Sequence, residues 1–249
     1  MIRIFRSSNI PVKLTGVGVA EKNKTCQLHD DDIPSYRLGN KKLPPAKKEI
    51  YGSASVRKSL KKCQHNKCCY SEAKFNRDSI HVEHYRPKAA LGMLGSNKKT
   101  YPGYYWLAYE WSNLMLCKAG INSDKKDLFP LVKGKRAINH TSDLALEYPL
   151  IIDPTSEDPR KHIRFHKEQP FGLTRRGAFT VELLLNHPEL DEDRRRYYQT
   201  LLIMKNSLQK FNEIGLGESD LAAELREALA NAIKPDAEYS SMAIDLMKK

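Results

Sequence analysis

The spacing of apolar side chains divides the chain into a mixed first part and a helical last part. Residues 52–66 carry apolar side chains at helical spacing, with Lys and Arg on the other faces, which predicts a helix. Residues 79–84 and 162–166 alternate apolar with polar positions, which predicts two short strands. The aromatic run at 104–111 predicts a segment that packs in the core.

Helical spacing dominates after Pro188, a residue well suited to the first turn of a helix. A second helix is expected to start at Ser219 as its N-cap, and a third, short one holds Met242 and Leu246. These patterns predict an α+β chain, mostly α, in three regions. The regions are an N-terminal arm that is mostly irregular (1–50), a core with a following mixed α/β segment (51–187), and a C-terminal helical region (188–249).

Composition narrows the functional classes. No apolar run approaches the ~18 residues of a membrane span, and the first residues do not resemble a signal peptide, so we expect a cytoplasmic protein without a membrane partner. The net charge is +12. Residues 189–249 hold 9 Lys and Arg against 12 Asp and Glu, which leaves 33 against 18 in residues 1–188. The basic excess predicts a polyanionic partner such as nucleic acid, although a generally basic surface is an equally good reading.

The densest cluster of reactive side chains lies between residues 81 and 88. His84 has the chemistry of a general base, because its ordinary pKa lies near neutral pH. Glu83 offers hard oxygen ligands for Mg²⁺ or Mn²⁺, provided the strand ends or kinks so that it joins His84. Arg86 and Lys88 are candidates for phosphate contacts, and His81 is expected to support the site.

Two later segments complete this candidate site. Asn113 is expected to fix the loop or the histidine by hydrogen bonding, and Asn122 to supply a second metal ligand from the start of a returning helix. Lys125, further along that helix, is a third candidate for a phosphate contact. Each residue alone carries little information, but the ordered set should be rare by chance.

This ordered set resembles the PtuB family, the HNH nucleases of Septu-type anti-phage systems, including those attached to retrons. The resemblance covers most of residues 50–196 and rests on Lys67-Cys-Cys-Tyr-Ser-Glu72, Val82-Glu-His-Tyr-Arg-Pro-Lys88, Tyr104-Tyr-Trp-Leu-Ala-Tyr109, Asn113-Leu, Asn122-Ser-Asp-Lys125 and Pro149-Leu-Ile-Ile-Asp-Pro154. It implies an HNH (ββα-metal) nuclease core and a PtuA-type ATPase partner. In retron-linked systems it also implies a reverse transcriptase with its RNA–DNA product.

The cysteines depart from the family pattern, in which two Cys-x-x-Cys knuckles bind a structural zinc. Ser71 stands where the first knuckle would place its second cysteine, and Ile121 where the second knuckle would. A zinc site would therefore have to combine Cys68 and Cys117 with another ligand such as Cys63 or His65. We expect a metal-free packed turn instead.

Three functions remain open from the sequence. The first is a metal-dependent endonuclease acting on DNA. The second is a catalytically weak nucleic-acid-binding or scaffold subunit of the same complex, which the altered knuckles favour. The third is a toxin-like RNase, since a site that contacts backbone phosphates does not itself choose DNA over RNA.

Overall fold

The structure, a computed structural model, describes residues 1–75 and 80–248. Its helices are α1 (Val19–Asp31), α2 (Ile33–Arg37), α3 (Lys48–Tyr51), α4 (Ala54–Cys63), α5 (Ala119–Lys125), α6 (Arg175–Leu184), α7 (Pro188–Glu213), α8 (Asp220–Ala232) and α9 (Ser240–Met247). Its strands are β1 (Ile80–His84), β2 (Leu91–Gly92), β3 (Lys99–Thr100), β4 (Leu114–Lys118), β5 (Leu131–Gly134), β6 (Glu147–Pro149), β7 (Ile163–His166) and β8 (Gln169–Gly172). Within these residues, the strands form antiparallel pairs: β1 with β4, β2 with β3, β5 with β6 and β7 with β8. The chain is therefore α+β, as predicted.

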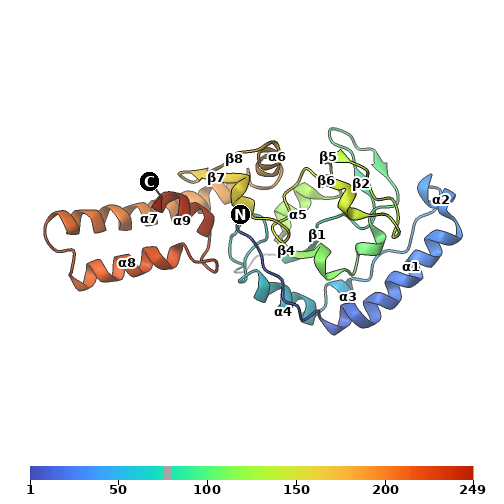
Figure 1. Ribbon diagram of the computed structural model, residues 1–249, viewed down its shortest axis with the longest axis horizontal. Coiled ribbons are helices and arrows are strands. Elements are labelled where there is room, and N and C mark those ends of the chain that lie inside the picture. The colour runs from blue at the N-terminus through green and yellow to red at the C-terminus, as the bar shows by residue number, and fades with distance from the viewer. Residues whose placement is uncertain (76–79, 249) are drawn as a thin grey trace.

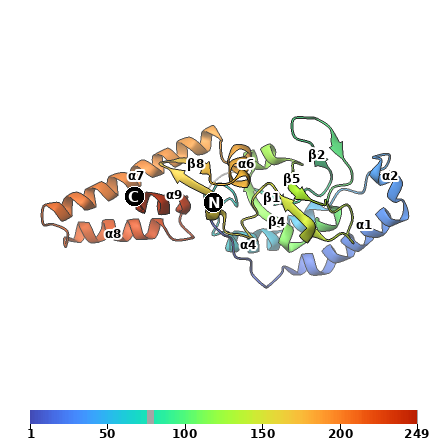
Figure 2. The ribbon, with the colours of Figure 1, turned by 45° about the horizontal axis from the view of Figure 1, so that its top comes forward.

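The molecule is elongated (Figures 1 and 2). Helices α7 and α8 form a hairpin that projects from one end, with α9 beside its base. The hairpin and α9 share a small apolar cluster of their own: Leu201, Leu229, Ala232, Ala243 and Leu246. The predicted helices of the last third are confirmed, including the Ser219 N-cap, whose Oγ accepts a hydrogen bond from the Ala222 amide. No helix in residues 1–75 or 80–248 is long and apolar enough to cross a membrane.

The main core surrounds the β1–β4 pair. Its aromatic centre is the run that the sequence assigned to packing, and the residues of this run, Tyr104, Tyr105, Trp106, Tyr109 and Trp111, are all buried. Helix α4 confirms the predicted helix and buries Val56 and Leu60 against this core. The predicted strand at 79–84 is observed as β1 from Ile80, and residue 79 lies outside the described residues.

The prediction of a mostly irregular N-terminal arm was wrong. Helices α1 and α2 occupy much of residues 19–37, and α1 contacts the core at the aromatic run. Helix α1 is polar on most faces and buries only Cys26 and His29, so it lacks the apolar stripe that would predict it. The ring of His29 stacks on that of Tyr105, with centroids 4.9 Å apart. Tertiary contact therefore stabilises a helix that periodicity does not reveal.

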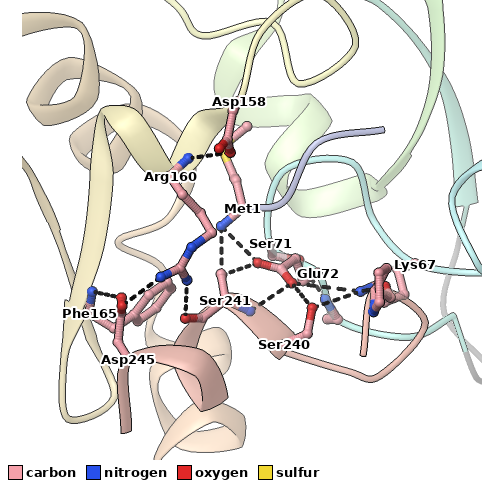
Figure 3. Close-up of polar contacts among 12 residues, drawn as sticks. Met1, Lys67, Ser71, Glu72, Asp158, Arg160, Phe165, Ser240, Ser241 and Asp245 are labelled. Atoms are coloured by element: carbon pink, nitrogen blue, oxygen red, sulfur yellow. Dashed lines mark hydrogen bonds and ion pairs between the residues drawn. The ribbon is translucent and has the colours of Figure 1, made fainter. Parts of the chain in front are cut away.

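A buried polar network joins the first residue, the turn after α4 and the last helix (Figure 3). The amino group of Met1 lies 2.8 Å from Glu72 Oε1, and the other carboxylate oxygen accepts a hydrogen bond from Ser240 Oγ. Asp245 on α9 accepts hydrogen bonds from Arg160 and from the amide of Phe165 on β7. Helix α9 is thus tied to the core by charged and polar groups as well as by packing.

Candidate active site

The candidate site lies on the β1–β4 pair and the helix that follows it. Glu83 stands opposite Met115 and His84 opposite Leu114, the first residue of β4. Helix α5 begins directly after β4 and packs back onto β1. Two strands and a returning helix are therefore adjacent in space, although 29 residues separate the strands in the sequence.

The side of β1 that carries His81 and Glu83 faces α5. His81 Nδ1 lies 3.3 Å from Asn122 Nδ2, and Lys125 Nζ lies 2.6 Å from Glu83 Oε1. Alternate strand residues share a face, and so do helix residues three apart, so these two contacts run in parallel. The structure thus brings Glu83, Asn122 and Lys125 together. It also corrects one detail, because Asn122 lies inside α5, whose N-cap is Lys118.

His84 is buried on the other side of the strand, because β1 pairs regularly with β4 as far as His84; the kink that would place Glu83 and His84 on one face is not observed. Its Nε2 lies 3.0 Å from the carbonyl oxygen of Ala108, so Nε2 carries the proton and donates it. The other ring nitrogen, Nδ1, lies 3.4 Å from Lys88 Nζ, which is the donor in that contact. Burial, with the charges of Lys88 and Lys125, holds the pKa of His84 well below its usual value. The imidazole is therefore neutral at pH 7 and presents the Nδ1 lone pair toward Lys88.

Glu83 forms an ion pair in a place where water does not reach. Its carboxylate is 4% exposed, and the side chain of Lys125 is fully buried. Burial raises the pKa of Glu83, while Lys125 and Lys88 act in the opposite direction. Lys125 Nζ also donates to the carbonyl of His84, at 3.1 Å. Lys125 therefore lies inside the site rather than at the surface, where a phosphate would reach it.

Asn113 ties the turn after β1 to the loop before β4. Its Oδ1 accepts a hydrogen bond from the Arg86 amide at 2.8 Å. Its Nδ2 donates to the carbonyls of Arg86 and Leu107, at 3.0 and 3.1 Å. Leu107 immediately precedes Ala108, the residue whose carbonyl holds His84. Asn113 thus hydrogen-bonds both the turn after β1 and the loop that carries the Ala108 carbonyl.

The other two candidates for phosphate contacts, Arg86 and Lys88, differ in how strongly other protein groups already bind them. Arg86 Nε binds Glu147 Oε2 at 2.8 Å, and its guanidinium lies over the rings of Tyr104 and Phe129, which commits it to the protein. Lys88 is half-buried beside His84, with Nζ 5.1 Å from the centre of the Tyr51 ring. Lys88 is consequently the cation best placed to meet a phosphate at His84.

Three buried thiols lie behind the site. The Sγ atoms of Cys68, Cys69 and Cys117 are within 4.8 Å of one another, close enough to share a metal ion. Burial raises the pKa of Cys69 and Cys117. Burial also acts to raise the pKa of Cys68, but hydrogen bonds with Cys117, Cys69 and Ser71 outweigh it, so the pKa of this thiol lies well below its usual value. Cys63 is not in this group, and its sulfur accepts a hydrogen bond from the Ser7 amide.

The sequence reasoning missed three features of this region. It did not identify Cys69 as the third thiol, the Ala108 carbonyl as the partner of His84, or Glu83 as the partner of Lys125. The pair of Glu83 and Lys125 could have been predicted, because an acidic residue on one face of a strand and a lysine on a returning helix are suited to form an ion pair. A backbone carbonyl leaves no mark in the sequence.

The chain was compared with known proteins. No family model matches it, and no solved structure shows a significant similarity. Septu protein PtuB of Bacillus mycoides (strain KBAB4) is 30% identical over 226 residues, which covers 80% of this chain and 75% of that protein. That identity extends over most of both chains, well beyond the candidate site. The chain therefore belongs to the PtuB family.

Proposed function

We propose that the chain is a metal-dependent HNH endonuclease that hydrolyses phosphodiester bonds of nucleic acid. In this proposal it is the nuclease of an anti-phage defence complex, with a PtuA-type ATPase as partner. The observation that carries the proposal is the geometry of His84: Nε2 is held by a backbone carbonyl, and Nδ1 keeps its lone pair toward the half-exposed Lys88. A general base needs such a nitrogen, held in one tautomer, to remove a proton from water.

The residues around His84 would act in sequence. Lys88 donates to Nδ1 in the resting protein, so this nitrogen becomes available when the ammonium moves to a phosphate of the substrate. His84 Nδ1 then accepts a proton from a water molecule that attacks the phosphorus, while the bond from phosphorus to the leaving sugar oxygen breaks and that oxygen takes a proton from solvent. The carbonyl of Ala108 keeps the ring in place and stabilises the imidazolium that results. Asn113 holds that carbonyl's loop throughout.

A hard divalent cation would bind on the α5 side of the strand, on the face opposite His84, and it would have to displace the ammonium of Lys125 from Glu83. Glu83 Oε1 is buried, and its partner in the resting protein is the ammonium of Lys125, 2.6 Å away. Asn122 uses its amide nitrogen toward His81, which leaves its oxygen directed elsewhere. Glu83 and Asn122 would hold Mg²⁺ or Mn²⁺, whose preferred ligands are oxygens. The ion would supply stabilisation of negative charge on the scissile phosphate.

The test is cleavage by His84→Ala, with the ATPase partner present, on DNA and RNA substrates in Mg²⁺, Mn²⁺ or EDTA. Loss of a general base should slow cleavage by roughly 100-fold or more, with nucleic-acid binding retained. The matched control is His65→Asn at an exposed histidine with positive φ, a conformation that asparagine tolerates. Cleavage by His84→Ala at the parent rate would refute the mechanism, and the substrate arms decide between DNA and RNA.

The α7–α8 hairpin is the proposed contact with the ATPase partner. It projects from the molecule and exposes large apolar side chains at Ile203, Ile214, Leu216, Leu221 and Ile233. Deleting residues 217–249 would also remove α9 and its bonds to the core, so point changes are the better test. Ile203→Glu and Leu221→Glu should reduce capture of the partner while the thermal stability stays near that of the parent. Unchanged capture by both variants would exclude this surface.

A further inference from the structure

A cavity of about 300 Å³ adjoins the candidate active site. One wall comes from the segment between α2 and α3, and the other from the loop before the aromatic run and from the run itself. Among the described residues, its lining holds four tyrosines and three lysines but no carboxylate, although one of these lysines, Lys41, pairs with Asp32 outside the lining. Such a lining suits a ligand that has both a flat apolar surface and negative charge.

The cavity reaches His84 through two shared residues. Ala108 lines the cavity, and its carbonyl accepts the Nε2 proton of His84. Lys88 also lines the cavity, and its ammonium contacts His84 Nδ1. His84 itself does not line the cavity, so a group bound there would be separated from the histidine by one residue. The group would lie next to Lys88, the cation that would meet a phosphate.

Tyr101 offers the aromatic surface for stacking. It is partly exposed, and Lys42 Nζ lies 5.9 Å from the centre of its ring. Tyr105, in contrast, is buried and already stacks on His29. Lys42 Nζ lies over the face of this ring, so a planar group that stacks on the same face would displace the ammonium, which could then pair with the phosphate of the nucleotide.

The size of the cavity limits what enters. About 300 Å³ is at the small end of the ~300–1,000 Å³ range of ligand pockets. One base with its sugar fits this range, whereas a duplex does not. From this position we propose that the cavity is a subsite for one unpaired nucleobase of the substrate strand, stacked on Tyr101. This subsite rests on the proposed nuclease function. It defines the substrate class as single-stranded or locally unpaired nucleic acid.

The test measures binding of fluorescent oligonucleotides to the full-length protein in EDTA, which prevents cleavage. Four ligands of equal length are compared at one salt concentration: single-stranded DNA, single-stranded RNA, a duplex, and a strand with abasic sugars. The abasic strand keeps the phosphate charge and removes the bases. The parent protein should bind the single strands roughly 5- to 150-fold more tightly than the abasic strand, the range expected for stacking of one base.

Variants connect this preference to the cavity. Tyr101→Ala should bind the normal strands as weakly as the parent protein binds the abasic strand, and Tyr101→Phe should restore the preference because it keeps the ring. Phe171→Ala, at an exposed aromatic residue on β8, is the matched control and should change nothing. Preference for only one of DNA and RNA would support the subsite and identify the sugar it accepts.

Two results would overturn the subsite. One is equal affinity for normal and abasic strands, and the other is an unchanged preference in Tyr101→Ala. Either would leave the nuclease proposal intact if cleavage still depends on His84. Conversely, a base preference that depends on Tyr101, in a protein whose cleavage does not depend on His84, would retain the subsite and refute the catalytic mechanism.

Discussion

Replacing Glu72 by Gln removes one negative charge from a network that is buried on all sides (Figure 3). The carboxylate lies between the amino group of Met1, at 2.8 Å, and the ammonium of Lys67, at 3.6 Å. Ser240 and Ser241 on α9 donate to its oxygens. The substitution keeps the shape of the side chain but leaves two buried cations without their counter-charge. We expect the variant to fold with much lower stability.

The magnitude follows from the pKa of Glu72. Burial alone would raise this pKa, but the charges of Met1 and Lys67 and the hydrogen bond from Ser241 lower it from 4.5 to about 2. One pKa unit corresponds to about 1.4 kcal/mol, so ionisation of Glu72 contributes about 3 kcal/mol to the free energy of unfolding. Losses of about 3–5 kcal/mol are usual when one partner of a buried pair is removed.

The assay is urea unfolding of the parent and Glu72→Gln between pH 7 and pH 3. Because the pKa is depressed in the folded state, the contribution is complete above about pH 4.5 and declines as the pH falls toward 2. The two proteins should therefore differ by about 3 kcal/mol at pH 7 and by about half of that at pH 3, because the folded-state pKa of about 2 lies below the range of the assay. Glu192→Gln, which breaks an exposed pair with Arg196, is the control and should cost less than about 1 kcal/mol. A Glu72→Gln variant as stable as this control at pH 7 would refute the reasoning.

Three further predictions concern the candidate site. Asn113→Asp should destabilise the protein at least as much as Asn113→Ala in thermal unfolding. The aspartate replaces the donor Nδ2 by an oxygen, which would face the two carbonyls that now accept hydrogen bonds from Nδ2. Lys125→Met should lower the free energy of unfolding by about 3–5 kcal/mol, because it leaves the buried carboxylate of Glu83 without its partner. Adding Glu83→Gln should recover part of this loss. If the losses of the two single variants simply add in the double variant, the two side chains are not coupled. Elemental analysis should find well under one zinc per chain, because three thiols are one short of the usual four ligands; stoichiometric zinc that Cys69→Ser abolishes would overturn this.

Local signals predicted the helical last third and the short strands of the core. The caps and apolar stripes of α7 and α8 come from residues close in the sequence, and so do the alternations of β1 and β7. Helix α1 escaped prediction because its buried face consists of a cysteine and a histidine. No local pattern marks such a face, and its partner, the aromatic run, lies some 80 residues away in the sequence.

The sequence also indicated which polar residues gather at the site, but not how they pair. Glu83 and His84 are adjacent in β1 and face opposite sides, as an ideal strand requires, so each finds a different partner. Glu83 pairs with Lys125 on α5, and His84 is held between Ala108 and Lys88. These pairings depend on two loops and a helix that return to β1 from distant positions, and no short-range pattern encodes them.

The opposite orientation of Glu83 and His84 has a consequence for the proposed reaction. In the resting arrangement each already has a partner, so the site is electrostatically satisfied without substrate. Lys88 is the member of this set that is half-exposed, and its charge acts on both Glu83 and His84. A phosphate that attracts Lys88 would release the basic nitrogen of His84 at the moment when the substrate arrives. Free water would meet a histidine that is still covered, which favours hydrolysis of bound nucleic acid over side reactions.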